Sequence, residues 1–237
     1  MPSALIDLSL ADLAISQQGA ADILAKYNLD FSCNGHRRLR EEAMRRGLDA
    51  ASIAAQIEEA GARPVDEPDW RAQAPDELVE HILGHLHGRY LSLLPQLIEQ
   101  ACRIEHSYAD WPECPHGMAL LLWNLQQDLA QHLLREKQLL PLLLGENRGA
   151  MPIAAMRLEH QSYVAALRDL ARLSNDFNAP ARACNTWISL YLGLWELRRE
   201  LMQHMHLENN LLFAAPGAGR PVQAAANSLD FDLGGQP

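Results

Sequence analysis

Hydrophobic positions follow a helical rhythm over most of the chain. Between residues 75 and 213, leucines and other apolar residues recur at steps of three and four, in four stretches that each begin at a proline. This spacing is typical of helices with one buried face, and proline is tolerated in the first turn of a helix. The stretches are 75–108, 115–144, 152–174 and 180–213. They would be roughly 30–50 Å long as helices, which predicts an antiparallel four-helix bundle.

The first 62 residues show shorter patterns separated by turn signals. Short helices are expected at Ala20–Tyr27, Arg37–Arg46 and Ala50–Ala60. The chain therefore divides into a small helical N-terminal domain (1–62), a linker (63–74), the bundle (75–213) and a disordered tail (214–237) rich in Ala, Gly and Pro. Pro141 should disturb the end of the second long helix.

Composition agrees with an all-α protein and narrows its class. Of the 237 residues, 48% are hydrophobic, helix formers dominate, and β-branched residues are sparse. The net charge of −10 argues against a nucleic-acid-binding face. No apolar run is long enough to span a membrane, and the N-terminus makes a poor signal peptide. The four cysteines are scattered without a Cys-x-x-Cys pair, which favours a reducing cytoplasm over a disulfide framework.

Histidines are the unusual feature of the sequence, which contains ten of them. Each long helix places one on its leucine-rich face, and two helices add a glutamate one turn later. The six inward residues are His87, His132, Glu136, His160, His204 and Glu208. The histidines expected on solvated faces are His81, His85, His106, His116 and His206.

The inward set indicates a metal site. A histidine and a glutamate four residues apart on a helix lie above one another and can reach one ion. A buried, ionised carboxylate is costly unless it is paired or bound to a metal. A single inward histidine is more often an ordinary core residue, but the repeated His-x-x-x-Glu pattern, with matching histidines on both other helices, favours a metal or a metal pair.

Several segments resemble one known family. Residues 26–35 read Lys-Tyr-Asn-Leu-Asp-Phe-Ser-Cys-Asn-Gly, similar to the family's Lys-Tyr-x-x-Asp-Tyr-Cys-Cys-Gly-Gly. Residues 94–95 (Leu-Pro), 132–136 (His-Leu-Leu-Arg-Glu), 159–160 (Glu-His) and 204–213 (His-Met-His-Leu-Glu-Asn-Asn-Leu-Leu-Phe) fall in family order and spacing. The chain resembles the RIC proteins, the di-iron proteins of iron–sulfur cluster repair.

The resemblance implies a hemerythrin-like bundle with two iron ions in an oxo-bridged, non-haem centre. Glu136 and Glu208 would bridge the irons, and His87, His132, His160 and His204 would be the histidine ligands. We expect His87 and His132 on one side and His160 and His204 on the other, a pairing that the sequence leaves open. The partners implied are nitric oxide or oxygen species and damaged iron–sulfur proteins; family members are cytoplasmic and often form homodimers. Asp128 and Glu159 are candidates for groups that support the ligands.

Two positions depart from the family pattern. A seventh ligand, normally histidine, is Tyr108 here. On the stripe of His87 it is expected to face the metals, either binding ferric iron as a phenolate or standing near a vacant coordination position. The family's cysteine pair is Ser32-Cys33 in this chain, so Cys33 has no neighbouring thiol with which to form a disulfide.

Two other interpretations remain open at this point. One is a hemerythrin-like buffer or sensor of nitric oxide or oxygen, without turnover. The other is a helical interaction protein that is free of metal or filled with zinc, in which Tyr108 marks the loss of the iron site. Sustained consumption of nitric oxide and the iron content distinguish these interpretations from a repair protein.

Overall fold

A computed structural model describes residues 4–62, 68, 70–144 and 152–214. Within these ranges the secondary structure is helical, and the only β-type pairing is an isolated bridge between Ser9 and Arg38. The helices are η1 Ala4–Asp7, α1 Leu10–Ser16, α2 Ala20–Lys26, α3 Leu39–Arg45, α4 Ala50–Gly61, α5 Pro75–His81, η2 Ile82–Leu86, α6 His87–Ser107, α7 Met118–Leu139, η3 Leu140–Leu144, α8 Ile153–Leu173, α9 Asn185–Leu207 and η5 Glu208–Leu212.

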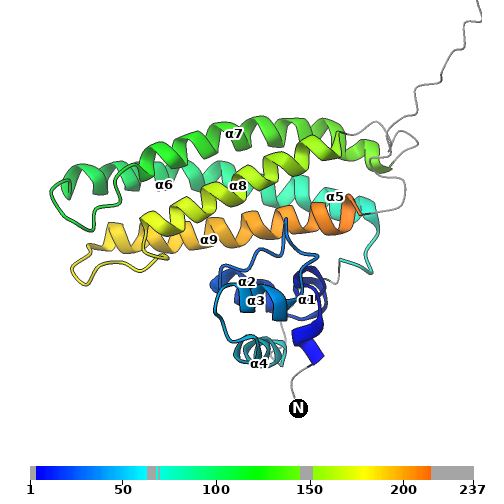
Figure 1. Cartoon of the computed structure of the whole chain (residues 1–237). Coiled ribbons are helices and arrows are strands. Elements are labelled where there is room, and N and C mark those ends of the chain that lie inside the picture. The colour runs from blue at the N-terminus through cyan, green and yellow to red at the C-terminus, as the bar shows by residue number, and fades with distance from the viewer. Residues whose placement is uncertain (1–3, 63–67, 69, 145–151, 215–237) are drawn as a thin grey trace, which may run out of the picture.

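Four long helices, α6 to α9, run up and down beside one another and form an antiparallel bundle (Figure 1). Their inward faces bury the leucine stripes read from the sequence. The buried residues include Leu94, Leu97, Leu122, Leu125, Leu129, Leu167, Leu190, Leu194 and Leu197. Because this apolar surface leaves water only when the helices pack together, the stripes account for the bundle. The prediction of an all-α, four-helix bundle is confirmed.

Two π-helical turns interrupt the predicted long helices. In η2 the His87 N–H donates to the carbonyl of Ile82, and at η5 the Phe213 N–H donates to the carbonyl of Glu208 at 2.7 Å. Each bond spans five residues, so the turn holds one residue more than an α-helical turn. π turns occur frequently at functional sites. Here one ends directly before His87 and the other begins at Glu208.

The helix ends follow local chemistry. Pro75 occupies the first turn of α5, as expected. α7 begins later than predicted, at Met118, because Gly117 before it has a positive φ of 87°, a backbone conformation that glycine adopts without strain. α7 ends at Leu139, and Pro141 lies in the 3₁₀ helix η3 that follows, since proline lacks the N–H that would continue the α-helix.

The N-terminal helices α1 to α4 form a small unit that packs against α9 (Figure 1). Its buried core is Leu10, Leu13, Leu24, Leu29, Phe31, Leu39, Ile53 and Ile57. Helix α1 was not predicted, although Ser9 caps it by accepting the Asp12 N–H at 3.0 Å, an N-terminal signal of the expected kind. Half of the predicted linker (63–67 and 69) and all of the predicted tail except Ala214 lie outside the described residues.

His206 corrects one prediction. It was expected on a solvated face of the last helix, but it is only 1% exposed. The N-terminal unit covers this face, with the His206 Nδ1 lying 3.2 Å from the carbonyl oxygen of Phe31 and the two rings packed edge to face. Burial lowers the His206 pKa to about 4, so the ring is neutral at pH 7. Of the other four histidines, His81 is half-buried against Trp70, and His85, His106 and His116 are exposed.

Glu42 ties the N-terminal unit together. It is 4% exposed, and its carboxylate accepts from Arg37 and Arg46, both at 2.8 Å. Burial alone would raise the pKa of Glu42, but the two guanidinium groups outweigh burial, and the pKa is lowered from 4.5.

We expect Glu42→Gln to reduce the free energy of unfolding at pH 7 by about 2 kcal/mol. This value is below the sum of about 3 kcal/mol that two bonds to a charged group give at the low end, because both arginines are partly exposed and screened by solvent. A group with a lowered folded pKa stabilises the protein above its unfolded pKa, and this contribution is lost as the pH falls. Urea denaturation should therefore show the difference shrinking below about pH 4.5. The exposed neighbour provides the control: Glu41→Gln should change stability by less than about 0.5 kcal/mol.

Candidate metal centre

Six of the seven predicted site residues converge in the bundle core. They are His87 on α6, His132 and Glu136 on α7, His160 on α8, His204 on α9 and Glu208 at the start of η5. Each is at most 2% exposed. They form two groups in which the candidate ligand atoms lie within 4.8 Å of one another: His132, Glu136, His160 and Glu208 in the first, and His87, Glu136 and His204 in the second.

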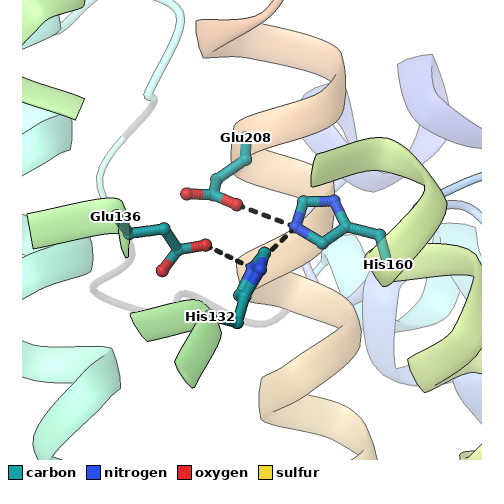
Figure 2. A group of neighbouring side chains, drawn as sticks. All are labelled: His132, Glu136, His160 and Glu208. Carbon is teal, nitrogen blue, oxygen red and sulfur yellow. Dashed lines mark hydrogen bonds and ion pairs between the residues drawn. The ribbon is translucent and has the colours of Figure 1, made fainter. Parts of the chain in front are cut away.

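The first group is drawn in Figure 2. His132 Nε2 lies 2.5 Å from Glu136 Oε1, and His160 Nε2 lies 3.1 Å from Glu208 Oε2. The two Nε2 atoms are themselves 3.1 Å apart. Two ring nitrogens and two carboxylate oxygens thus meet in one buried space, an arrangement suited to a shared cation.

The histidines of the second group lie near the other oxygen of Glu136, and His204 also lies near the other oxygen of Glu208. His87 Nε2 lies 2.8 Å from Glu136 Oε2. His204 Nε2 lies 3.6 Å from the same oxygen and 3.5 Å from Glu208 Oε1. Glu136 and Glu208 therefore each present one oxygen to either pair of histidines, as bridging carboxylates would between two cations.

This pairing differs from the expected one. The sequence interpretation placed His87 with His132 and His160 with His204. The structure places His132 near His160, with ring centroids 4.9 Å apart, and His87 near His204, with centroids 5.3 Å apart. Helical periodicity identifies the inward face of each helix, but only the packing of the helices decides which inward side chains meet.

The donor atoms fit a metal pair. Both oxygens of Glu136 and of Glu208, and both ring nitrogens of His87 and of His204, are buried without a hydrogen bond of normal geometry, although ion-pair contacts of 2.5–3.6 Å link them. Buried polar atoms without hydrogen bonds are costly. Four imidazoles and two carboxylates inside a helical bundle are a donor set for two first-row transition-metal ions, which would satisfy these atoms.

Charges within the cluster balance one another. Burial alone would raise the Glu136 pKa, but the charge of His204 and the close contacts of His132 and His87 lower it well below 4.5. Burial would lower the His204 pKa, but Glu136 and Glu208 raise it to about 9. At pH 7 the metal-free cluster therefore holds a proton on His204, and binding a cation must release that proton.

Polar groups behind the ligands orient two of the imidazoles. Glu159 Oε2 lies 2.5 Å from His132 Nδ1, and Asn209 Oδ1 lies 3.0 Å from His160 Nδ1. Each contact occupies Nδ1 and directs Nε2 inward, the usual support for a metal-bound histidine. Of the two predicted supporting groups, Glu159 makes this contact. Asp128 contributes its backbone carbonyl, which accepts from the Tyr163 hydroxyl at 3.2 Å.

Sequence reasoning missed Asn209 and the aromatic rings around the cluster. Tyr90 stacks on His204 with centroids 5.7 Å apart, and its hydroxyl donates to the Glu200 carbonyl at 2.9 Å. Tyr163 packs edge-on against His132, and Phe213 stacks on His160. Tyr90 was visible on the same apolar stripe as His87, but its role as a wall of the site follows from packing with α9.

Tyr108 is not brought to the cluster, which corrects the expectation that it faces the metals. It directly follows α6, whose 21 residues begin at His87, and so lies about 31 Å farther along the helix axis. Its ring contacts Trp111 and Trp187, and its hydroxyl interacts with Cys184. A shared stripe places two residues on the same side of a helix, but it does not place them at the same height.

We expect Glu159→Ala to weaken metal binding about tenfold without unfolding the protein, because loss of a group behind a ligand typically costs 10–100-fold in affinity. Competition with a chromophoric chelator measures the change. Asp128→Asn, which alters a nearby exposed carboxylate, should leave the affinity within about twofold. Equal affinities for Glu159→Ala and the wild type would show that Glu159 does not support the site.

The fold and this cluster define a helical bundle of the hemerythrin type. Consistent with this, the Hemerythrin family model, described as the hemerythrin HHE cation binding domain, matches residues 78–215. The ScdA_N model, described as a domain of unknown function (DUF542), matches residues 6–61.

Curated relatives narrow the class. Several similar proteins are called iron-sulfur cluster repair protein YtfE. The one from Musicola paradisiaca is 38% identical to this chain over 208 residues, which cover 86% of this chain and 94% of the relative. The Pectobacterium atrosepticum protein is 37% identical over 210 residues, covering 87% and 95%. The Citrobacter koseri protein is 35% identical over 216 residues, covering 90% and 98%. The chain therefore belongs to the RIC family, which includes the YtfE proteins. None of its described helices is long and apolar enough to cross a membrane.

Proposed function

We propose that this protein holds two iron ions, joined by an oxo bridge, and takes part in the repair of iron–sulfur clusters damaged by nitrosative or oxidative stress. The observation that carries this proposal is the placement of Glu136 and Glu208, each with one oxygen toward either histidine pair. The relatives' name, iron-sulfur cluster repair protein, supports the biological task.

The bound irons would supply electrons and an exchangeable position at which nitric oxide is bound or reduced. The chain's own residues hold that site in place. Glu159 and Asn209 fix the rings of His132 and His160, while the rings of Tyr90 and Phe213 pack against His204 and His160 and exclude bulk water. Low water content strengthens the attraction between the carboxylates and a cation.

The proposal assigns no thiolate chemistry to Cys33. Burial, followed by the charge of Asp30, raises the pKa of this thiol to about 12. The thiolate is the reactive form of cysteine, so at neutral pH Cys33 is protonated and a poor nucleophile. The proposed chemistry accordingly resides at the metal centre.

The proposed partners are nitric oxide or oxygen species and damaged iron–sulfur proteins. The proposed location is the cytoplasm, in keeping with the four free cysteines.

We also propose that the protein forms a homodimer, because the family that it resembles often does. Size-exclusion chromatography coupled to light scattering measures the oligomeric state, and a monomer at all concentrations would refute the dimer without touching the metal centre.

Three measurements test the proposal. Protein purified without chelators should contain about two irons per chain and absorb in the near-ultraviolet as oxo-bridged ferric pairs do. Under reductant it should consume nitric oxide over many turnovers, and it should restore activity to an enzyme whose cluster nitric oxide has damaged. Stoichiometric uptake without turnover or repair would instead favour a buffer or sensor. Fewer than about half an iron per chain would refute the di-iron centre.

A further inference from the structure

Asn209 connects a proposed metal ligand to the N-terminal unit. It lies in η5 next to Glu208 and is 8% exposed. Its Oδ1 accepts from the His160 Nδ1–H at 3.0 Å. Its Nδ2 donates to the carbonyl of Ser32 at 3.3 Å and lies 3.6 Å from Cys33 Sγ. One planar carboxamide thus contacts His160 with one end and the loop of residues 28–35 with the other.

The backbone of Asn209 is held independently. Its carbonyl accepts from Arg157 at 3.1 Å, and it belongs to the π turn closed by the Glu208–Phe213 bond. A shift of the loop would therefore act on the side-chain carboxamide of Asn209 more than on its backbone. Rotation moves Oδ1, and with it the preferred orientation of the His160 ring.

The loop offers a well-defined surface to Asn209. Asp30, 2% exposed, accepts from the backbone N–H groups of Ser32 and Cys33, from the Ser32 hydroxyl and from the Asn34 side chain, at 2.7–3.2 Å. These bonds fix the positions of the Ser32 carbonyl and of Cys33 Sγ. A cavity of about 420 Å³, lined by Cys33, Arg157 and Asn209 among others, adjoins this contact.

We propose that Asn209 is a positioning residue through which the 28–35 loop, including Cys33, controls the orientation of His160 and hence the affinity and electronic state of the metal centre. This inference rests on the proposed function, because it requires His160 to be a ligand. Movement or modification of the loop would then change the metal centre without touching any ligand directly.

The neighbouring Asn210 provides a matched control. Its Nδ2 donates to the carbonyls of Phe31 and Ser32, at 3.2 and 3.1 Å, so it holds the same loop. It contacts His206 rather than a proposed ligand. Loss of Asn210 loosens the loop contact, whereas loss of Asn209 also frees His160.

The first measurement uses cobalt(II) as the probe, in chelator competition and in proton NMR of the exchangeable imidazole N–H groups. Asn209→Leu should weaken cobalt binding about tenfold and speed the exchange of one shifted N–H proton, that of His160, with D₂O. Asn209→Asp keeps an acceptor for His160 and should recover most of the affinity. Asn210→Leu should stay within about twofold of the wild type.

The second measurement tests the coupling. A Cβ at Gly35 would stand 2.5 Å from the carbonyl oxygen of Phe31, 2.8 Å from the Cβ of Ala11 and 3.2 Å from Asn210 Oδ1, so Gly35→Ala must displace the loop. Cys33→Ala is a milder change that removes only the contact between Cys33 Sγ and Asn209. It replaces Gly35→Ala in the experiment if Gly35→Ala unfolds the N-terminal unit. Either change should shift the His160 N–H resonance in the wild-type and Asn210→Leu backgrounds. In the Asn209→Leu background the shift should disappear.

The outcomes separate this inference from the proposed function. Two cobalt ions per chain, with the same His160 signal and the same loop response in Asn209→Leu as in the wild type, would overturn the role of Asn209 and leave the metal centre standing. Loss of the response in Asn210→Leu as strongly as in Asn209→Leu would also overturn it, because general loosening of the loop would then be the cause. No cobalt binding by the wild type would refute the metal centre itself.

Discussion

Replacing Glu136 with glutamine is expected to reduce the iron content from about two per chain to fewer than about 0.5. Glu136 belongs to both ligand groups, with Oε1 near His132 and Oε2 near His87. The amide is neutral and offers one oxygen, so it cannot serve both groups. Only Glu208 would then be left as a carboxylate to balance the charge of two cations. Because an uncompensated charge in the core is costly, the cations would bind weakly.

Elemental analysis and the near-ultraviolet spectrum measure this effect. Glu200→Gln is a matched control, because Glu200 is also buried and carries a carboxylate but pairs with Arg89 rather than with the cluster. It should retain about two irons. Two irons in Glu136→Gln would show that this carboxylate does not bridge the ions. One iron would show that the two groups bind their ions separately.

Removing the metal is expected to lower the free energy of unfolding by about 4 kcal/mol, the effect of a ligand present at about a thousand times its dissociation constant. For a domain of this size that corresponds to a fall in Tm of about 10 °C. The physical reason is that the unfolded chain cannot assemble six ligands from four helices, so the metal binds only the folded state.

The size of this effect should depend on pH. In the metal-free protein the His204 pKa is raised from 6.5 to about 9. The protonated ring therefore adds fully to the free energy of unfolding below pH 6.5, and this contribution is lost as the pH rises through 9. The Glu136 pKa is lowered, so its carboxylate adds to the free energy of unfolding above about pH 4.5, and this contribution is lost as the pH falls. Metal binding competes with the proton on His204. The difference between loaded and metal-free protein should therefore grow from pH 6 to pH 9.

Calorimetry of both forms across this pH range checks the prediction. Glu136→Gln, treated with the same metal, should show little difference between its two forms, because it lacks the bridging oxygens. A loaded wild type that unfolds at the same temperature as the metal-free protein would indicate that the metal binds at the surface rather than in the bundle core.

Local sequence chemistry determined much of the fold. Apolar residues at three- and four-residue steps place Leu94, Leu129, Leu167 and Leu194 in the core, because a helix with one apolar face is stable only when that face is covered. The same periodicity predicted which four of the ten histidines, and which two glutamates, belong to the metal centre. The His-x-x-x-Glu spacing placed each of two histidines beside the glutamate of its own helix, and the family resemblance implied that all six residues meet at one site.

Packing between distant segments decided the rest. His206 is on a polar stripe, yet the N-terminal unit buries it against Phe31. Tyr108 shares a stripe with His87, yet the rise of the helix carries it to the opposite end of α6. The partner of each histidine depends on which helices pack together, α6 with α9 and α7 with α8. The link from His160 through Asn209 to the 28–35 loop depends on how α8 and η5 meet that loop. Periodicity along one helix specifies a direction around its axis, whereas these contacts need positions in three dimensions, which only the assembled tertiary structure supplies.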